Sequence, residues 1–366
     1  MRVALVCDWF LPRVGGIELH LRDLAQALRA RDIDARILTT TRGPDVVDEI
    51  PVQRIGASLA PAGFAFTPAA LHTVGRAVRD GGFDVVHAHA SVVSPVAIAG
   101  AIAARRAGLP SIVTFHSMLH RASFLLGASE ALFGWAERGV VLSAVSSVVA
   151  EQAARWIPRA SVGVLPNGVD ARFWRGAPRE APRDEVVFAS AMRLTRKKRP
   201  LRLVRAFAQA VRFVAGAPSL RLIVAGAGPE LDAMVRLAAE LGVADRMTLL
   251  GERTRSELRA LYARAHAFVL PSERESFGIA ALEARTAGLP VVAMMATGAR
   301  DFIRHGVDGL LARDEADLSR QMSRLALDEP FRAYVLNRNA LIVPPYDWSE
   351  VAALHLGMYA HAARRS

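Results

Sequence analysis

Cysteine is almost absent from this sequence, since Cys7 is the only one among 366 residues. A single cysteine can form neither an intrachain disulfide nor a cysteine-based metal centre. Chains without disulfides are typical of reducing compartments. We therefore expect a cytoplasmic protein.

Long uninterrupted apolar runs are also scarce. One stretch without Asp, Glu, Lys or Arg covers residues 85–104, but histidines, serines and a proline interrupt it. A membrane span needs about 20 predominantly apolar residues, so we interpret this stretch as a strand followed by a helix. The apolar run at the N-terminus ends at Asp8 and is too short for a signal peptide. The sequence predicts a protein that is soluble or peripheral to a membrane.

Basic residues outnumber acidic ones, 46 to 35, and the segment 193–212 contains no acidic residue. The net charge is +11, and residues 193–212 contain eight Lys or Arg but no Asp or Glu. Nucleic acid, an anionic membrane or a phosphorylated substrate would each suit such a cluster. Few aromatics and no nucleic-acid-binding motif accompany it, so we expect no nucleic-acid partner. Three interpretations of the cluster stay open. It could bind a phosphorylated substrate, it could make peripheral contact with the inner face of an anionic membrane, or its outer arginines could form a solvated helix face.

Length and a hydrophobic content of 52% predict two domains with separate cores. Strands alternate with helices in both halves, which is typical of an α/β fold with two doubly wound sheets facing a cleft. The predicted parts are a first domain of residues 1–170, a linker of residues 171–184, a second domain of residues 185–345 and a last helix, 346–366, that returns to the first domain. Residues 43–70, rich in Pro, Gly and Ala, are expected to be a loop-rich crossing.

Residues 270–293 show the clearest local pattern, with the end of a strand, a turn, a helix and another strand. Ser276 is the expected N-cap of this helix and Gly288 its C-cap. In such a unit the helix begins at the carboxyl edge of a parallel sheet. Open α/β folds bind ligands at that edge, and the free N–H groups of the helix favour an anion there.

Two glutamates stand in a fixed relation to this helix. Glu275 precedes it and Glu283 lies inside it, so roughly 10–12 Å separates them along the axis. A small substrate cannot easily touch both, whereas an extended ligand with hydroxyl groups at each end can. A nucleotide-sugar is such a ligand, with a sugar at one end and a ribose at the other. The alternative is two solvated acids on an amphipathic helix.

Two glycine patterns follow buried strands. Gly15 and Gly16 open a helix, which is the arrangement of a phosphate-binding turn. Gly226 and Gly228 suggest a dinucleotide-binding motif, but Leu231 stands where the third glycine would be. The second pattern therefore argues against a nicotinamide-dependent oxidoreductase.

Histidines occur near the ends of two further predicted strands, at His87 and His89 and at His116. Such histidines are more often structural, and no Cys or acid at zinc-ligand spacing accompanies them. His116 is the better functional candidate because it follows its strand directly at the ligand edge. Asp32 and Asp34 form an Asp-x-Asp pattern, but they lie where a strand begins, on the opposite edge of the sheet. We therefore expect no metal site.

Eight motifs occur in the order GGIELH, DVVHAH, TFH, PNGVD, RLTRKK, GAGPE, PSERESFGIAALEA and GVDGLL. In this order the chain resembles the retaining glycosyltransferases of family four, whose B-type fold has two Rossmann-like domains. The resemblance covers nearly the whole sequence. It implies transfer of a sugar from a nucleotide-sugar, expected to be a UDP- or GDP-sugar, to an acceptor hydroxyl with retention of configuration. The resemblance implies that the first domain binds the acceptor and the second domain binds the donor. It does not imply a metal ion or a bound cofactor.

The resemblance assigns three residues to the donor diphosphate. Gly16 would contact it through its backbone, and Arg193 and Lys198 would neutralise it as it leaves. Fixed cations and a helix N-terminus can stabilise that developing charge without a metal. The sequence departs from the family at Arg199, where glycine usually follows the lysine. Lys197 is therefore a second candidate for the contact with the diphosphate.

The remaining assignments concern the two sugars of the donor. His116 would contact a hydroxyl of the donor sugar, Glu275 would hold that sugar, and Glu283 would hold the ribose. The donor-binding set is Gly15, Gly16, Arg193, Lys198, Glu275, Ser276, Phe277, Gly278 and Glu283, and the catalytic set is His116, Arg193, Lys198 and Glu275.

The resemblance leads us to expect a sugar or a lipid as the acceptor. Similar GGxExH starts occur in phosphatidylinositol mannosyltransferases and in the catalytic subunit that begins GPI-anchor synthesis, which suggests glycolipid or cell-envelope glycan synthesis. Residues 117–135 are apolar beside His120 and Arg121, and they fit either a lipid or acceptor contact or packing against the second domain. A nucleotide-sugar epimerase or a non-catalytic nucleotide-sugar binder is the alternative function.

Overall fold

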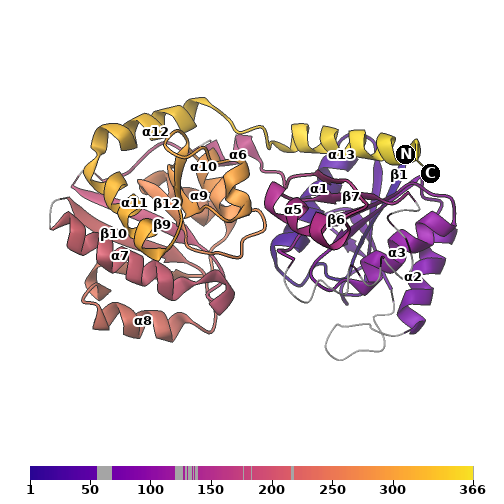
Figure 1. The fold of residues 1–366 in the computed structure, drawn as a ribbon, viewed down its shortest axis with the longest axis horizontal. Coiled ribbons are helices and arrows are strands. Elements are labelled where there is room, and N and C mark those ends of the chain that lie inside the picture. The colour runs from indigo at the N-terminus through magenta and orange to yellow at the C-terminus, as the bar shows by residue number, and fades with distance from the viewer. Residues whose placement is uncertain are drawn as a thin grey trace. The chain divides into compact units, whose positions relative to one another are not determined.

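The computed structural model describes residues 1–55, 68–119, 139–175, 177–182, 184–215 and 218–365, together with residues 127, 130, 134 and 136. They form two compact units, one of Met1–Gly168 with Tyr346–Ser366 and one of Val169–Pro345. Each unit contains a parallel sheet with helices packed against it (Figure 1). The predicted α/β class with two Rossmann-like domains is therefore confirmed.

The sheet of the first unit has the strand order β3-β4-β2-β1-β5-β6-β7-β8. Its strands are β1 (Arg2–Cys7), β2 (Asp34–Thr39), β3 (Val46–Val47), β4 (Ile50–Arg54), β5 (Val85–Ala90), β6 (Ser111–Phe115), β7 (Val141–Ala144) and β8 (Val162–Val164). Neighbouring strands are parallel, apart from the β3–β4 pair. Residues 3–7 are all buried, as expected for an apolar strand inside a sheet that is covered on both faces.

The prediction of a loop-rich crossing at residues 43–70 is wrong for the part that contains β3 and β4. Ile50 and Val52 are buried, and β4 extends the sheet beside β2. Pro51 hides this strand in the sequence, because proline usually argues against a strand and is tolerated mainly near a sheet edge. Residues 56–67 of this segment lie outside the described residues.

The first unit includes helices α1 (Gly16–Arg29), α2 (Pro68–Asp80), α3 (Pro95–Arg106), α5 (Ser147–Trp156) and α13 (Trp348–Ala363). α1 buries Leu21, Leu24 and Leu28, which recur at the spacing of one helix face. Tyr359 and Ala362 of α13 enter the same hydrophobic core. The C-terminal helix is thus part of the first unit.

The sheet of the second unit is parallel throughout, with the order β11-β10-β9-β12-β13-β14. Its strands are β9 (Glu185–Ala191), β10 (Ser219–Ala225), β11 (Met247–Gly251), β12 (Ala267–Leu270), β13 (Val291–Met294) and β14 (Gly309–Ala312). Its helices include α6 (Ala171–Arg175), α7 (Pro200–Val214), α8 (Leu231–Glu240), α9 (Arg255–Arg264), α10 (Ile279–Thr286), α11 (Glu315–Leu327) and α12 (Glu329–Leu341).

The segment 171–184, expected to be a linker, packs into the second unit. It begins with α6, whose Trp174 is buried with its ring centroid 5.4 Å from that of Tyr262. Arg179 donates hydrogen bonds to the carbonyl oxygens of Tyr262 and Ala265, at 2.9 and 2.6 Å. These contacts hold most of the expected linker against α9 and the residue that follows it.

The strand-turn-helix-strand unit predicted at residues 270–293 is present as β12, α10 and β13. The predicted N-cap is wrong, because Gly278 and not Ser276 caps α10. Gly278 has a φ of 98°, in the left-handed region that favours glycine. At the other end Ala287 is the C-cap, and Gly288 follows it with a φ of 95°.

Asp308 ties three parts of the second unit together. Its carboxylate accepts hydrogen bonds from Arg304 Nε at 2.6 Å and Arg338 Nε at 3.1 Å, and it lies 3.4 Å from Arg285 Nη2 on α10. Burial raises the pKa of Asp308, but the hydrogen bonds from Arg304 and Arg338 and the charges of Arg285 and Arg304 outweigh it and lower the pKa to about 2. The carboxylate therefore helps to fix α10.

Replacing Asp308 by alanine is expected to lower the free energy of unfolding of the second unit by about 3–5 kcal/mol, because the buried Arg285 loses this partner. Denaturant unfolding measures the change. The control is Glu185→Ala, which removes a more exposed ion pair with Arg221 and should cost about 1 kcal/mol or less. Equal losses for the two variants would contradict the anchoring role.

The same contribution has a predictable pH dependence. A carboxylate with a lowered pKa stabilises the fold above the unfolded pKa of about 3.9 and loses this effect as the pH falls through its folded pKa, which is about 2 for Asp308. The difference in stability between the parent and Asp308→Asn should shrink between about pH 4 and pH 2.

Candidate functional site

The candidate residues of the second unit lie where strands end at the carboxyl edge of its sheet. After β12 the chain turns at Glu275, which is buried with 8% of its surface exposed. Its Oε2 accepts a hydrogen bond from Lys198 Nζ at 2.6 Å. Lys198 belongs to a short 3-10 helix, η2 (Arg196–Lys198), that follows β9. Because β9 and β12 are paired, this ion pair joins the loops that follow two adjacent strands.

The loop that carries Arg193 is fixed by the two glycines after β10. Leu194 N donates to Ala227 O at 2.8 Å, and a Cβ on Gly226 or Gly228 would overlap the carbonyl oxygen of Met192 or Leu194. Both glycines also have positive φ angles, 139° and 152°. The Gly-x-Gly pattern thus has a packing role here, which explains it without a dinucleotide.

The turn at Glu275 is held from the other side by Gly298, which the sequence reasoning missed. Gly298 N donates to Glu275 O at 3.0 Å. A Cβ on Gly298 would overlap Ser276 O and would lie 2.7 Å from Phe277 Cα. Gly298 begins a 3-10 helix, η4 (Gly298–Asp301), just after β13. The sequence offered one signal for Gly298: this glycine follows β13 closely, just as the turn at Glu275 follows β12.

Most of the eight basic residues at positions 193–212 pair with acids. Five make ion pairs with described residues, namely Arg196, Lys198, Arg199, Arg202 and Arg205. The partners of Arg202 and Arg205 on α7 are Glu273 and Glu315, so these two arginines form a compensated helix face. Arg193 and Lys197 are exposed and make no ion pair with any described residue. Of the two candidate lysines, Lys198 is the one that reaches Glu275.

Arg199 occupies the position where the family resemblance leads us to expect glycine. Its φ of 57° and ψ of 45° are left-handed, so glycine would relieve the steric cost of a Cβ. Its own ion pair with Glu273 spans 3.5 Å between half-exposed groups. The departure from the family pattern is therefore tolerated with local backbone strain.

Glu283 lies on α10 and is buried, with 8% of its surface exposed. Its charge adds to burial in raising the pKa of Tyr262 well above the ordinary value. The alternative of two solvated acids is wrong, because both Glu275 and Glu283 are buried. A buried carboxylate is costly unless polar groups compensate it, which favours a specific role for both.

In the first unit the predicted pair of glycines opens α1, with Gly15 as its N-cap and no side-chain cap. Glu18 in the first turn is buried, and its Oε1 lies 3.5 Å from Arg13 Nε. A Cβ on Gly15 would overlap the end of the Glu18 side chain. An acid near a helix N-terminus is favourable, and the sequence reasoning did not single it out.

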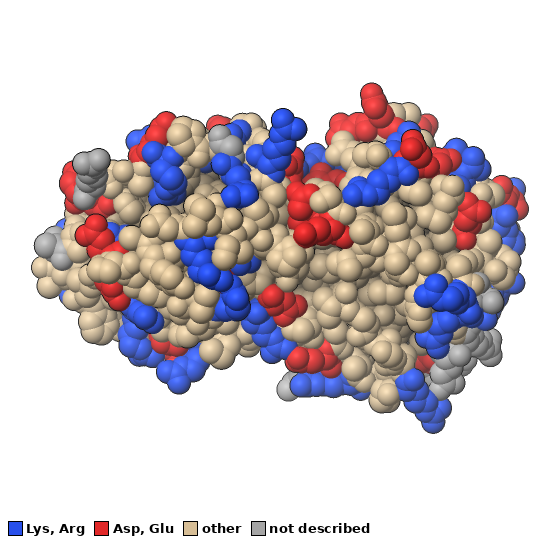
Figure 2. Space-filling model, turned by 90° about the horizontal axis from the view of Figure 1, so that it is seen from above, with Lys and Arg blue, Asp and Glu red and all other residues tan. Residues whose placement is uncertain are grey.

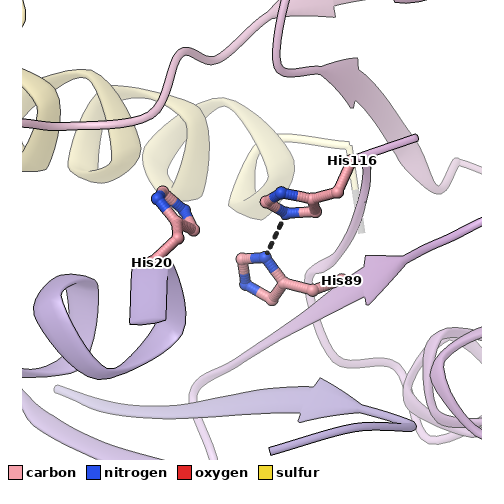
Figure 3. Close-up of side chains that lie close together, drawn as sticks. All are labelled: His20, His89 and His116. Carbon is pink, nitrogen blue, oxygen red and sulfur yellow. Dashed lines mark hydrogen bonds between the residues drawn. The ribbon is translucent and has the colours of Figure 1, made fainter. Parts of the chain in front are cut away.

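Histidines from several elements meet in the first unit (Figure 3). His116 directly follows β6 as predicted, but His87 and His89 lie within β5 and not beyond it. His89 Nδ1 and His116 Nε2 share a hydrogen bond of 2.9 Å. His20 of α1, in the GGIELH motif, approaches His116 with 5.1 Å between ring centroids. His20 was not predicted, because its helix and the two strands are far apart in sequence.

These histidines are neutral near pH 7. Burial lowers the pKa of His116 to about 3, with a smaller effect from His355. Burial also lowers the pKa values of His20 and His89 well below 6.5. The first unit therefore presents uncharged imidazoles where the second presents ion pairs.

The remaining predictions concern the Asp-x-Asp pattern, the apolar segment 117–135 and membrane spans. Asp34 begins β2 and pairs with Arg2 and Arg36, whose hydrogen bond and charges lower its pKa. In the segment 117–135, residues 120–126 and most that follow lie outside the described residues. Among the residues that are described, no helix is long and apolar enough to cross a membrane.

Known proteins resemble the chain over nearly its full length. The family models "Glycosyltransferase Family 4" and "Glycosyl transferases group 1" match residues 14–173 and 175–342. The D-inositol 3-phosphate glycosyltransferase of Stackebrandtia nassauensis is 30% identical, over 96% of this chain and 88% of its own. The phosphatidyl-myo-inositol mannosyltransferase of Mycobacterium leprae is 29% identical, over 99% and 97%. Among solved structures, Anabaena HepE in complex with UDP has a TM-score of 0.79 and 22% identity, over 99% and 100%.

The strain at Arg199 is testable through a pair of variants. Arg199→Gly and Arg199→Ala both remove the guanidinium, but only glycine removes the Cβ. We expect the glycine variant to be more stable than the alanine variant by about 1 kcal/mol, the typical cost of a left-handed non-glycine residue. Chemical denaturation compares the two, and an alanine variant as stable as the glycine variant would contradict the strain.

Proposed function

The chain belongs to the glycosyltransferases of family four, and from this premise we propose that it is a retaining hexosyltransferase that uses a nucleotide-sugar donor and no metal ion. The observation that carries the proposal is the ion pair between the buried Glu275 and the half-buried Lys198, in the turn before α10. It supplies an acid, a fixed cation and a helix N-terminus at the carboxyl edge of one sheet, where open α/β folds bind ligands.

The proposed chemistry concerns the bond between the anomeric carbon and the diphosphate oxygen. This bond breaks while a bond to the acceptor oxygen forms, and the acceptor hydroxyl passes its proton to an oxygen of the leaving diphosphate. Negative charge develops on the leaving diphosphate. Arg193, exposed and without an ion partner among the described residues, and Lys198 would stabilise that charge together with the N–H groups at the start of α10.

The other residues would hold the donor. We assign Glu275 to hydroxyl groups of the transferred sugar and Glu283 to the ribose. Their burial supports this assignment, since a carboxylate in a dry environment makes strong and specific hydrogen bonds to hydroxyl groups. In the first unit, His116 would contact the donor sugar, and the backbone at Gly15 and Gly16 the diphosphate.

The known relatives suggest which substrates to test. HepE was solved with UDP, so a UDP-sugar is the first donor, followed by GDP- and ADP-sugars. The curated relatives are named for D-inositol 3-phosphate and phosphatidyl-myo-inositol, which makes inositol phosphates and inositol lipids the first acceptors.

On the face in Figure 2, Lys and Arg lie scattered among Asp and Glu, and peripheral contact with an anionic membrane stays a prediction.

The two buried glutamates should lose different functions. Glu283→Gln is expected to weaken binding of the nucleoside diphosphate alone, because the ribose contact is lost. Glu275→Gln should leave that binding nearly intact and lower kcat by roughly 30- to 1000-fold, which corresponds to about 2–4 kcal/mol of transition-state stabilisation. Titration calorimetry and steady-state rates measure the two effects.

The matched control is Glu273→Gln, two residues from Glu275, because Glu273 pairs only with the α7 region among the described residues. It should turn over the donor at the parent rate. Turnover by Glu275→Gln at the parent rate, with an unchanged melting temperature, would refute the proposed site. Oxidation, epimerisation or binding without turnover of the donor would identify one of the alternative functions.

Metal independence has its own test. Transfer is expected to survive excess EDTA, because Arg193 and Lys198 take the place of a divalent ion at the diphosphate. Product formation is followed with and without the chelator. Complete loss of transfer that Mg²⁺ or Mn²⁺ restores would overturn this part of the proposal.

A further inference from the structure

Three buried histidines meet in the first unit, from α1, from β5 and from the residue after β6 (Figure 3). One nitrogen of each of His20, His89 and His116 lies within 4.8 Å of the others. Their exposed fractions are 4%, 2% and 5%. The cluster is therefore buried but not completely sealed.

The ring positions fit a common metal ion. Centroids of the His20 and His116 rings and of the His89 and His116 rings are 5.1 Å apart, and those of His20 and His89 are 6.1 Å apart. Imidazoles bound to one tetrahedral Zn²⁺ at about 2.0–2.1 Å have ring centroids about 5 Å apart and ligand nitrogens about 3.3 Å apart. The 2.9 Å hydrogen bond between His89 and His116 would need to lengthen by only a few tenths of an ångström.

The hydrogen bonding distinguishes these rings from their neighbours. His20 Nδ1 and His89 Nε2 are buried without a partner among the described residues. In contrast, His87 uses both nitrogens, bonding Tyr359 and Thr114, and His355 Nδ1 bonds Val351 O. Buried polar atoms without partners cost about 1–3 kcal/mol each and call for an explanation such as an ion. Among the described histidines of this cluster, such atoms occur in His20 and His89, two of the three converging rings. The unpartnered His89 atom is Nε2, whereas its Nδ1 faces His116.

The donor set also limits the ion. Three imidazoles without a thiolate or a carboxylate suit Zn²⁺, Ni²⁺, Cu²⁺ or Fe²⁺ and disfavour Mg²⁺ and Ca²⁺, which take oxygen ligands. Burial lowers the pKa values of all three residues. Neutral imidazoles can bind a metal without first losing a proton.

We propose that His20, His89 and His116 bind one divalent transition-metal ion, with Zn²⁺ as its first representative, and that the bound ion inhibits sugar transfer by engaging His116. This site is separate from any metal requirement of catalysis. The inhibition rests on the proposed contact of His116 with the donor sugar, whereas the metal site does not.

Binding is tested on the full chain after treatment with a chelator and dialysis. Equilibrium dialysis against ZnCl₂ should give one Zn²⁺ per chain, and Co²⁺ should give the visible absorption of tetrahedral nitrogen coordination. Zn²⁺ should also raise the melting temperature by mass action. The Co²⁺ spectrum and the melting shift need no variant. Absence of uptake by the parent chain would overturn the proposal.

Variants locate the site. His20→Ala and His89→Ala should each weaken Zn²⁺ binding more than about tenfold, since loss of even an outer-shell partner has effects of this order. His355→Gln, a buried histidine of the same cluster, and His361→Ala, an exposed residue of α13, should bind like the parent. If the His20 and His89 variants fold and bind like the parent, the ion lies elsewhere and the proposal is wrong.

The inhibitory step has a separate outcome. Zn²⁺ should stop sugar transfer by the parent chain, EDTA should restore it, and His20→Ala should tolerate at least tenfold more Zn²⁺. Zn²⁺ that binds at the three histidines without slowing transfer would refute inhibition and the role of His116 while leaving the metal site intact. Failure of the glutamate variants to affect transfer would refute the proposed donor site and leave Zn²⁺ binding unchanged.

Discussion

The ion pair between Lys198 and Glu275 is the interaction on which the second unit's site depends. It joins the loops after β9 and β12, and each loop is fixed separately by glycine packing. Gly226 and Gly228 hold the first loop, and Gly298 holds the second. The pair can therefore be short, 2.6 Å, with little freedom to reorganise. Groups fixed in this way stabilise developing charge without the cost of rearranging.

Ion pairs of this kind reduce the unbalanced positive charge of the basic segment 193–212. Acids on neighbouring elements compensate Arg202 and Arg205 of α7, and Glu275 compensates Lys198. Arg193 is exposed without an ion partner among the described residues. Lys197 is also exposed without an ion pair among those residues. Two such cations beside a paired lysine suit an anionic group that approaches one loop, whereas a broad basic surface would be expected for nucleic acid.

Local patterns in the sequence predicted the local structure well. The buried strands and the β12-α10-β13 unit follow from short apolar runs and from turn residues, whose effects act over a few positions. The partner of Lys198, the packing of Gly298 and the meeting of His20 with His116 depend on how distant loops are brought to one sheet edge. Ser276 shows the limit of local reasoning, because tertiary contacts of the turn at residues 275–277 move the start of α10 to Gly278.

The buried polar groups of the two units differ in charge. This difference determines what each unit can contribute to a reaction. In the second unit the buried carboxylates of Glu275 and Asp308 each have a cation beside them. In the first unit burial favours neutral forms, since it lowers the pKa of His116 to about 3 and raises that of Asp8 to about 6. Neutral imidazoles can accept hydrogen bonds from hydroxyl groups or ligate a metal, but they cannot neutralise a diphosphate. The proposed assignment of Arg193 and Lys198 to the leaving diphosphate would supply the positive charge that these imidazoles lack.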